Sequence, residues 1–133
     1  MAVLASATTA FAGSSSTYYV GKNSQGQSLL FSVDHTASGP KFDPFFTTMS
    51  GICPATHTRF GIQFSFSGFQ IPIKNGKFSM SLNDIQDRFT WSGTVAPKKA
   101  SGTQFYDFPG FANGLGLQLC ATGSLTWTAK GLV

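Results

Sequence analysis

Apolar and polar residues alternate along most of the chain. The clearest run is residues 59–66, where one face of an extended chain carries Phe60, Ile62, Phe64 and Phe66. The same alternation predicts three further inward-facing sets: Phe78, Met80 and Leu82; Phe89, Trp91, Gly93 and Val95; and Leu125, Trp127 and Ala129. Strands with one apolar and one polar face are typical of antiparallel sheets.

Turn signals separate these strands. Asn75-Gly76 stands between two apolar runs and predicts a type I′ hairpin turn, because both residues tolerate positive φ. Residues 23–26 and 97–99 predict two more turns, and residues 83–87 one short helical turn capped by Asn83 or Asp84. Further strands are expected at residues 17–22, 28–34, 45–53, 69–73 and 100–106. The pattern predicts an all-β domain over residues 17–133, a single antiparallel β-sandwich or flattened barrel of about eight to ten strands.

Composition narrows the class of protein. The chain has 133 residues, of which 41% are hydrophobic and 11% charged, so it has enough apolar surface to form one core and is not expected to be disordered. The net charge of +4 is scattered singly apart from Lys98-Lys99, whereas nucleic-acid-binding proteins cluster their basic residues. No apolar run reaches the 18 residues of a membrane helix. We therefore expect neither a nucleic-acid partner nor a transmembrane segment.

Residues 1–16 have two interpretations. Ala10 and Ala12 stand at the small-residue positions of a signal-peptide cleavage site, but no Lys or Arg precedes the apolar stretch. The segment is either a signal-peptide remnant or an extended N-terminal strand. Export predicts that the mature protein is secreted or held at a cell surface.

Cys53 and Cys120 form an even pair, which predicts a disulfide in an exported chain. The alternative is a zinc site built on Cys53 and His57, for which His35 and Cys120 are the remaining ligands. We expect the disulfide, and no metal or other cofactor.

A series of short motifs runs from residue 18 to residue 130. It comprises YVG at 19–21, SQGQ at 24–27, LFSV at 30–33, Cys53, IPIKNGKFS at 71–79, ASGT at 100–103, CATG at 120–123 and WTAK at 127–130. In this pattern the chain resembles small secreted β-rich bacterial domains that have no assigned activity. The resemblance implies a fold and export, but no chemistry.

Catalytic motifs are not found in the sequence. It contains no G-x-S-x-G, H-E-x-x-H or Walker A motif. Asp84 and Asp87 are the only carboxylates close enough in sequence to suggest a glycosidase pair, and His35 beside Asp34 is the only candidate acid–base pair. We expect a protein that is not an enzyme.

Two aromatic segments interrupt the motif pattern at residues 41–46 and 105–111, where shorter polar loops are expected. If these segments are loops at one end of the sandwich, their rings could stack on sugars, with carboxylates accepting hydrogen bonds from hydroxyls. The candidate ligand-binding residues are Phe42, Asp43, Phe45, Phe46, Phe105, Tyr106, Asp107, Phe108 and Phe111. The alternative is that the phenylalanines fold inward and plug the open end of the sandwich, because Phe has no polar group to place in water.

The N-terminal segment suggests a different role. Residues 2–11 are uncharged and compatible with a strand, and residues 13–16 could act as a flexible connection to a neighbouring chain. A donated strand would point one set of side chains into its recipient: Val3, Ala5, Ala7, Thr9 and Phe11. Repeated head to tail, this contact forms a filament. The sequence therefore predicts a non-enzymatic structural module whose partner is itself, and alternatively a carbohydrate-binding module whose partner is a polysaccharide or the cell wall.

Overall fold

The computed structural model describes residues 15–84, 87–112 and 116–132, which form ten antiparallel strands and no helix. In chain order the strands are β1 (Ser15–Asn23), β2 (Ser28–Thr36), β3 (Gly39–Cys53), β4 (Thr58–Ser65), β5 (Ile71–Pro72), β6 (Lys77–Asn83), β7 (Arg88–Val95), β8 (Lys99–Ala112), β9 (Gly116–Ala121) and β10 (Leu125–Leu132). The predicted all-β fold is confirmed.

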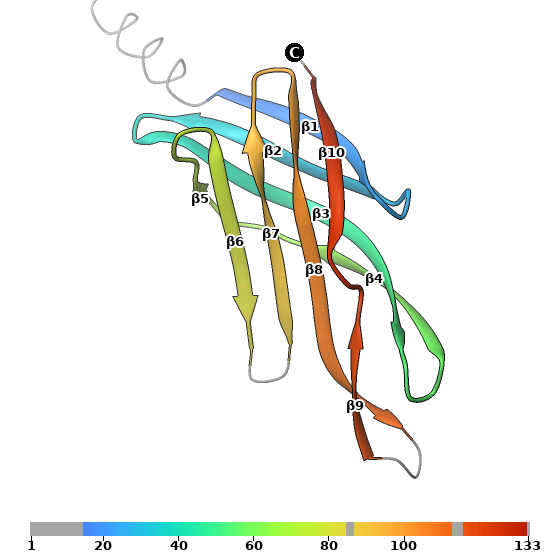
Figure 1. The fold of residues 1–133 in the computed structure, drawn as a ribbon. Helices are drawn as coiled ribbons and strands as arrows, with labels where there is room; N and C mark the ends of the chain where they lie inside the picture. The colour runs from blue at the N-terminus through green and yellow to red at the C-terminus, as the bar shows by residue number, and fades with distance from the viewer. Residues whose placement is uncertain (1–14, 85–86, 113–115, 133) are drawn as a thin grey trace, which may run out of the picture.

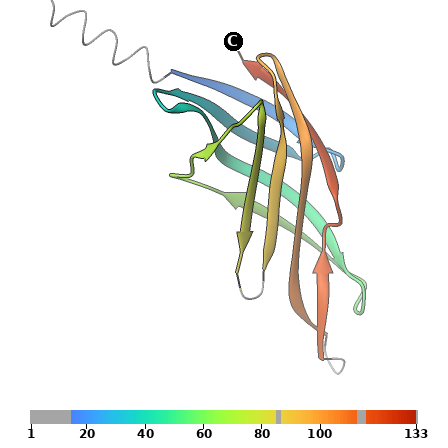
Figure 2. The same cartoon turned by 60° about the vertical axis from the view of Figure 1, so that its left-hand side comes forward.

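The ten strands belong to one sheet that bends into two layers. One layer runs in the order β4, β3, β2, β1, and the other in the order β6, β7, β8, β10 (Figure 1). β1 pairs with β10 where the layers join, and β9 extends from β8 to touch β3 at the pair Ile52–Ala121. The two views show that the layers cross one another (Figure 2). The fold is a flattened barrel in which, within the described residues, β4 and β6 do not pair.

Aromatic side chains fill the space between the layers. Phe31 lies on Tyr19 and meets Trp91 and Trp127 edge-on, with ring centroids 5.9 and 5.6 Å away. Phe42 stacks on Phe78 at 3.8 Å. The alternation in the sequence explains this core, since the inward residues of β6, β7 and β10 are the ones predicted to face inward.

The turns also follow the sequence. Asn75 and Gly76 have φ of 53° and 74°, as a type I′ turn requires. Gly26 N–H donates to the carbonyl of Asn23 at 2.9 Å, and Ala96 N–H donates to the carbonyl of Lys99 at 2.8 Å. All three predicted hairpin turns are confirmed.

The prediction of two aromatic loops was wrong. Residues 41–46 lie inside β3, which is 15 residues long, and residues 105–111 lie inside β8, which is 14 residues long. Each segment contains a proline that the sheet accommodates: the register with β2 shifts opposite Pro44, and Pro109 pairs with Leu119 of β9.

Other elements also differ from expectation. β9 was not predicted, and the strand expected at residues 69–73 contains only the two residues of β5. β1 begins at Ser15, so Ser15 and Ser16 belong to the sheet rather than to a flexible connection. Asn83 ends β6, whereas residues 85 and 86 of the expected helical turn lie outside the described residues.

Candidate functional site

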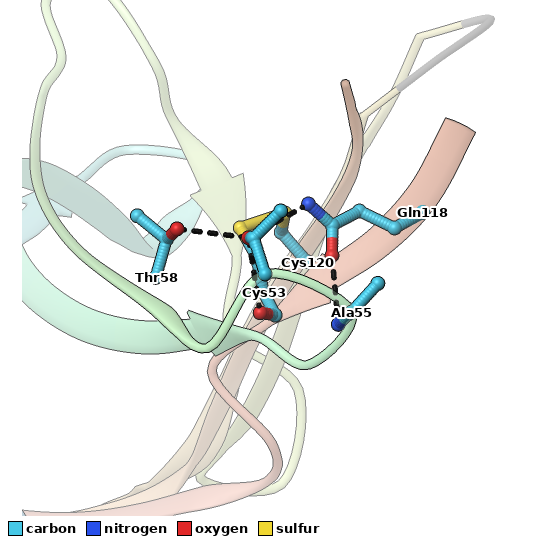
Figure 3. The surroundings of a disulfide bond; sticks show 6 residues. Cys53, Ala55, Thr58, Gln118 and Cys120 are labelled. Carbon is cyan, nitrogen blue, oxygen red and sulfur yellow. Dashed lines mark hydrogen bonds between the residues drawn. A yellow bond between two sulfur atoms is a disulfide. The ribbon is translucent and has the colours of Figure 1, made fainter. Parts of the chain in front are cut away.

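The disulfide joins Cys53 at the end of β3 to Cys120 in β9 (Figure 3). Beside it, Gln118 accepts a hydrogen bond from the N–H of Ala55 at 2.9 Å and donates to the hydroxyl of Thr56 at 3.1 Å. The bridge and these bonds fasten the β3–β4 turn to β9. The predicted disulfide is confirmed. The alternative zinc site needed Cys53 and Cys120 as free thiolates, and both sulfur atoms are in the disulfide.

The candidate acid–base pair of Asp34 and His35, which the sequence did not favour, does not form in the described structure. Neighbouring residues of a strand project to opposite faces, and the Asp34 carboxylate instead accepts hydrogen bonds from Ser16, Ser32 and Gln70. Burial raises the pKa of Asp34, but hydrogen bonds involving Ser32, Ser16, Asp43 and Gln70 outweigh it and lower that pKa overall. Within the described ranges no group of three or more His, Cys, Asp or Glu residues is arranged to hold a metal ion.

The residues of the first aromatic segment separate onto the two faces of β3. Phe42 is fully buried in the core, and Asp43 lies beside Asp34 on the outer face. Phe45 is half-buried at the shift in register, where its ring lies 5.8 Å from the exposed Tyr18. Phe46 is also half-buried. The segment therefore contributes to the core and does not form a continuous platform of rings.

The second aromatic segment is divided in the same way. Tyr106 and Asp107 are each 5% exposed, and Phe105 and Phe108 are half-buried. Asp107 binds the guanidinium of Arg88 through both carboxylate oxygens, and the Tyr106 hydroxyl donates to Asp87 at 3.1 Å. Burial, followed by the hydrogen bond to Asp87 and the charges of Asp87 and Asp107, raises the pKa of Tyr106 to about 12. These polar groups bind one another and hold β8 to β7. The last candidate residue of this segment, Phe111, lies further along β8.

An unpaired strand edge is the most distinctive feature of the described structure. β4 pairs with β3 from Thr58 to Ser65, and no described strand pairs with its other edge. Phe66 N–H donates to the carbonyl of Phe45, and bonded pairs alternate along an antiparallel ladder. The N–H and C=O groups of Arg59, Gly61 and Gln63 therefore point away from β3 and are available to another strand.

Incompletely covered aromatic side chains accompany this edge. Phe60, Ile62 and Phe64 project from β4 toward β7 and β8, and all three are half-buried. Phe64 contacts Phe89 and Tyr106, with ring centroids 4.6 and 4.8 Å away.

A recess of about 300 Å³ lies beside these rings. It is lined by Phe64, Leu82, Phe89 and Tyr106, with Asn83, Asp84 and Asp87 also contributing. A space of this size can take one apolar side chain.

No family model matches the chain, and no curated protein or solved structure matches it either. Among the described residues no helical segment has the length and hydropathy needed to cross a membrane. Function is therefore inferred from the geometry of the strands and side chains alone.

The sequence located the inward residues of β4 but not the exposure of its edge. Phe60, Ile62 and Phe64 show the period-two pattern of an ordinary half-buried strand, which is the same for central and edge strands. Which strands become neighbours depends on pairings that are distant in sequence, such as β1 with β10. The predicted donor residues Val3, Ala5, Ala7, Thr9 and Phe11 lie outside the described residues.

Proposed function

We propose that the protein is a secreted or cell-surface structural module without enzymatic activity, and that it assembles with copies of itself by strand donation. The N-terminal segment of one copy would pair with the unpaired edge of β4 in the next. The observation that carries the proposal is this edge, because it combines unpaired backbone groups with aromatic side chains that are only half-buried. The disulfide supports export, since such bonds persist in oxidising compartments.

β4 is a better acceptor than β6, which among the described strands pairs only with β7. Of the inward residues of β6, Phe78 and Met80 are 5% and 1% exposed and Leu82 alone is half-buried, so a further strand would cover less there. In contrast, β4 presents three half-buried apolar residues. Its charged residue, Arg59, stands near its beginning, and it contains no proline that would protect the edge from pairing.

The composition of the N-terminal segment suits this acceptor. Residues 2–11 contain no charged side chain, and the predicted inward set is small except for Phe11. Small residues can approach the phenylalanines of β4 closely, and the Phe11 ring is of a size to enter the recess beside Phe64. Main-chain hydrogen bonds to Arg59, Gly61 and Gln63 would then supply most of the affinity.

The distance to be bridged favours donation between copies. Four strand spacings of about 4.8 Å separate β1 from the position beside β4, which is roughly 19 Å. If residues 2–11 occupied that position, the four residue steps from Phe11 to Ser15 could span at most about 14 Å. The segment would therefore reach the β4 edge of a second copy, and repetition of this head-to-tail contact produces a filament.

A proline on the acceptor edge tests the proposal. Gly61→Pro removes an N–H that points away from β3, so the monomer should tolerate it while strand addition is blocked. Native mass spectrometry of the full chain should find multiples of 14.1 kDa for the unchanged protein and the monomer alone for this variant.

The matched control is Ser79→Pro on β6. Val95 N–H donates to the carbonyl of Gly76, so by the same alternation Ser79 N–H points away from β7. This variant should assemble like the unchanged chain. Equal assembly of the two proline variants would exclude β4 as the acceptor, as would a native mature protein that begins at Gly13. If Gly61→Pro does not fold, deletion of residues 2–12 replaces it and should give a folded monomer that binds a synthetic peptide of residues 1–12.

A further inference from the structure

A groove with three lysines crosses the outer surface where the two layers join. It has a volume of about 660 Å³ and lies over β1, β10, β8 and β7. Lys22, Lys99 and Lys130 line it together with the hydroxyl-bearing residues Thr94, Ser101 and Thr128. All six residues are exposed. None of the described residues that line the groove is acidic.

The strand register brings the lysines together. Lys130 of β10 is directly opposite Lys99 of β8, and Lys22 of β1 is opposite Thr128, two residues from Lys130. Side chains directly opposite one another on neighbouring strands have Cβ atoms about 5 Å apart, and like charges in such a pair repel. The fold therefore holds positive charges close together without an acidic residue in the groove to offset them, which is the arrangement expected where an anion binds.

Hydroxyl groups extend the same surface across the second layer. Thr128, Ser101 and Thr94 are successive cross-strand neighbours, and the next residue in this row is Lys77 of β6. Thr94 also borders a second hollow of about 660 Å³, whose lining includes Lys74, Lys77, Ser79 and Ser92. β10, β8, β7 and β6 lie side by side in both views, so the row crosses the full width of this layer (Figure 1, Figure 2). A linear polymer that lay across the layer would contact lysine side chains at both ends of this row and Ser and Thr hydroxyl groups between them.

We propose that this surface binds a linear anionic polymer of sugar or polyol units joined by phosphodiesters. Lysine ammonium groups bind phosphate as point charges, and the three cations that line the groove are all lysines. Ser and Thr hydroxyls can exchange hydrogen bonds with the hydroxyls of the polymer units.

Two other anionic partners, a nucleic acid and a lipid bilayer, fit the surface less well. Proteins that bind single-stranded nucleic acid provide aromatic rings on which bases stack, and the groove is lined by none. A lipid bilayer presents a broad surface that cannot enter a concave groove. The site lies on the β6–β7–β8–β10 layer and the adjoining β1, whereas the proposed strand acceptor is β4, so the two proposals can fail independently.

Binding of poly(glycerol phosphate) to the full chain, measured by isothermal titration calorimetry in about 0.1 M salt, tests the proposal. Lys99→Gln/Lys130→Gln should weaken the affinity about tenfold, as expected for the loss of two exposed ionic contacts. The control Lys41→Gln/Ser67→Asp makes the same change in net charge outside the groove, at residues that belong to neither the groove nor β4. It should leave the affinity within about twofold of the unchanged protein. Neutral dextran should not bind.

Three outcomes would overturn the proposal. An equal loss of affinity in both double variants would mean that only net charge matters. Equally tight binding of oligothymidylate, or of vesicles containing an anionic phospholipid, would mean that the surface does not select a polyol polymer. No heat of binding with poly(glycerol phosphate) at millimolar phosphate would mean that the groove does not bind this class of polymer.

Discussion

Asp34 and Asp43 form a coupled pair of carboxyl groups on neighbouring strands, on the outer face of the β1–β4 layer. The register places Asp43 opposite Ser32, whose hydroxyl donates to Asp34 at 2.7 Å. Burial, followed by the hydrogen bond and the charge of Asp34, raises the pKa of Asp43 to about 6. Asp34 receives the hydroxyl and amide donors and stays ionised, so the pair holds one proton in mildly acidic solution.

The raised pKa predicts a dependence of stability on pH. The folded pKa of Asp43, about 6, exceeds its ordinary value of 3.8, so protonation of Asp43 stabilises the fold. This contribution is complete below pH 3.8 and is lost as the pH rises through about 6. Asp43→Asn removes the ionisation and should raise the free energy of unfolding at pH 7.5 by roughly 1 kcal/mol, after discounting for solvent screening.

Thermal melts between pH 4.5 and pH 8 measure this effect. The difference in melting temperature between Asp43→Asn and the unchanged chain should grow across this range and level off above pH 7. A difference that is the same at every pH would mean that Asp43 is not protonated at mildly acidic pH.

The strands show which features of the fold the sequence determines locally. Alternation in β4, β6, β7 and β10 and the Asn75-Gly76 turn were sufficient to predict those elements, because period-two burial and positive φ are local properties. β3 and β8 were predicted too short: the strands expected at residues 45–53 and 100–106 extend over Gly39–Cys53 and Lys99–Ala112, which include Pro44 and Pro109. Here the shift in register near Pro44 and the pairing of β8 with both β7 and β9 keep the strands continuous.

The disulfide is an element-scale restraint that can be tested directly. It joins residues 67 positions apart and ties the β3–β4 turn to β9. Cys53→Ser/Cys120→Ser should lower the free energy of unfolding by about 4 kcal/mol, the loop-closure entropy of a cross-link of this length. Urea denaturation measures the loss. Reductant should lower the midpoint of the unchanged protein and have no effect on the double variant, whereas equal midpoints for the two oxidised proteins would contradict a stabilising role.

At the scale of the whole molecule, the important feature is the gap that the described strands leave between β4 and β6 in an otherwise continuous bent sheet. The gap leaves one edge with unpaired backbone groups and a recess beside it, while the lysine groove lies where the layers join. Neither feature could be predicted from the sequence. The edge depends on which strands pair over long sequence distances, and the groove brings Lys22 of β1 next to Lys99 and Lys130 more than 70 positions later.

Residue-resolved hydrogen exchange of the β4 amides tests strand donation most directly. The full chain and the chain lacking residues 2–12 are compared at the same concentration. Donation predicts that the amides of Arg59, Gly61 and Gln63 exchange slowly in the full chain and rapidly in the shortened one, because the donated strand bonds only the outward groups of β4. The amides of Phe60, Ile62 and Phe64, which bond β3, should be protected in both. Rapid exchange of the outward amides in both chains would contradict strand donation at β4.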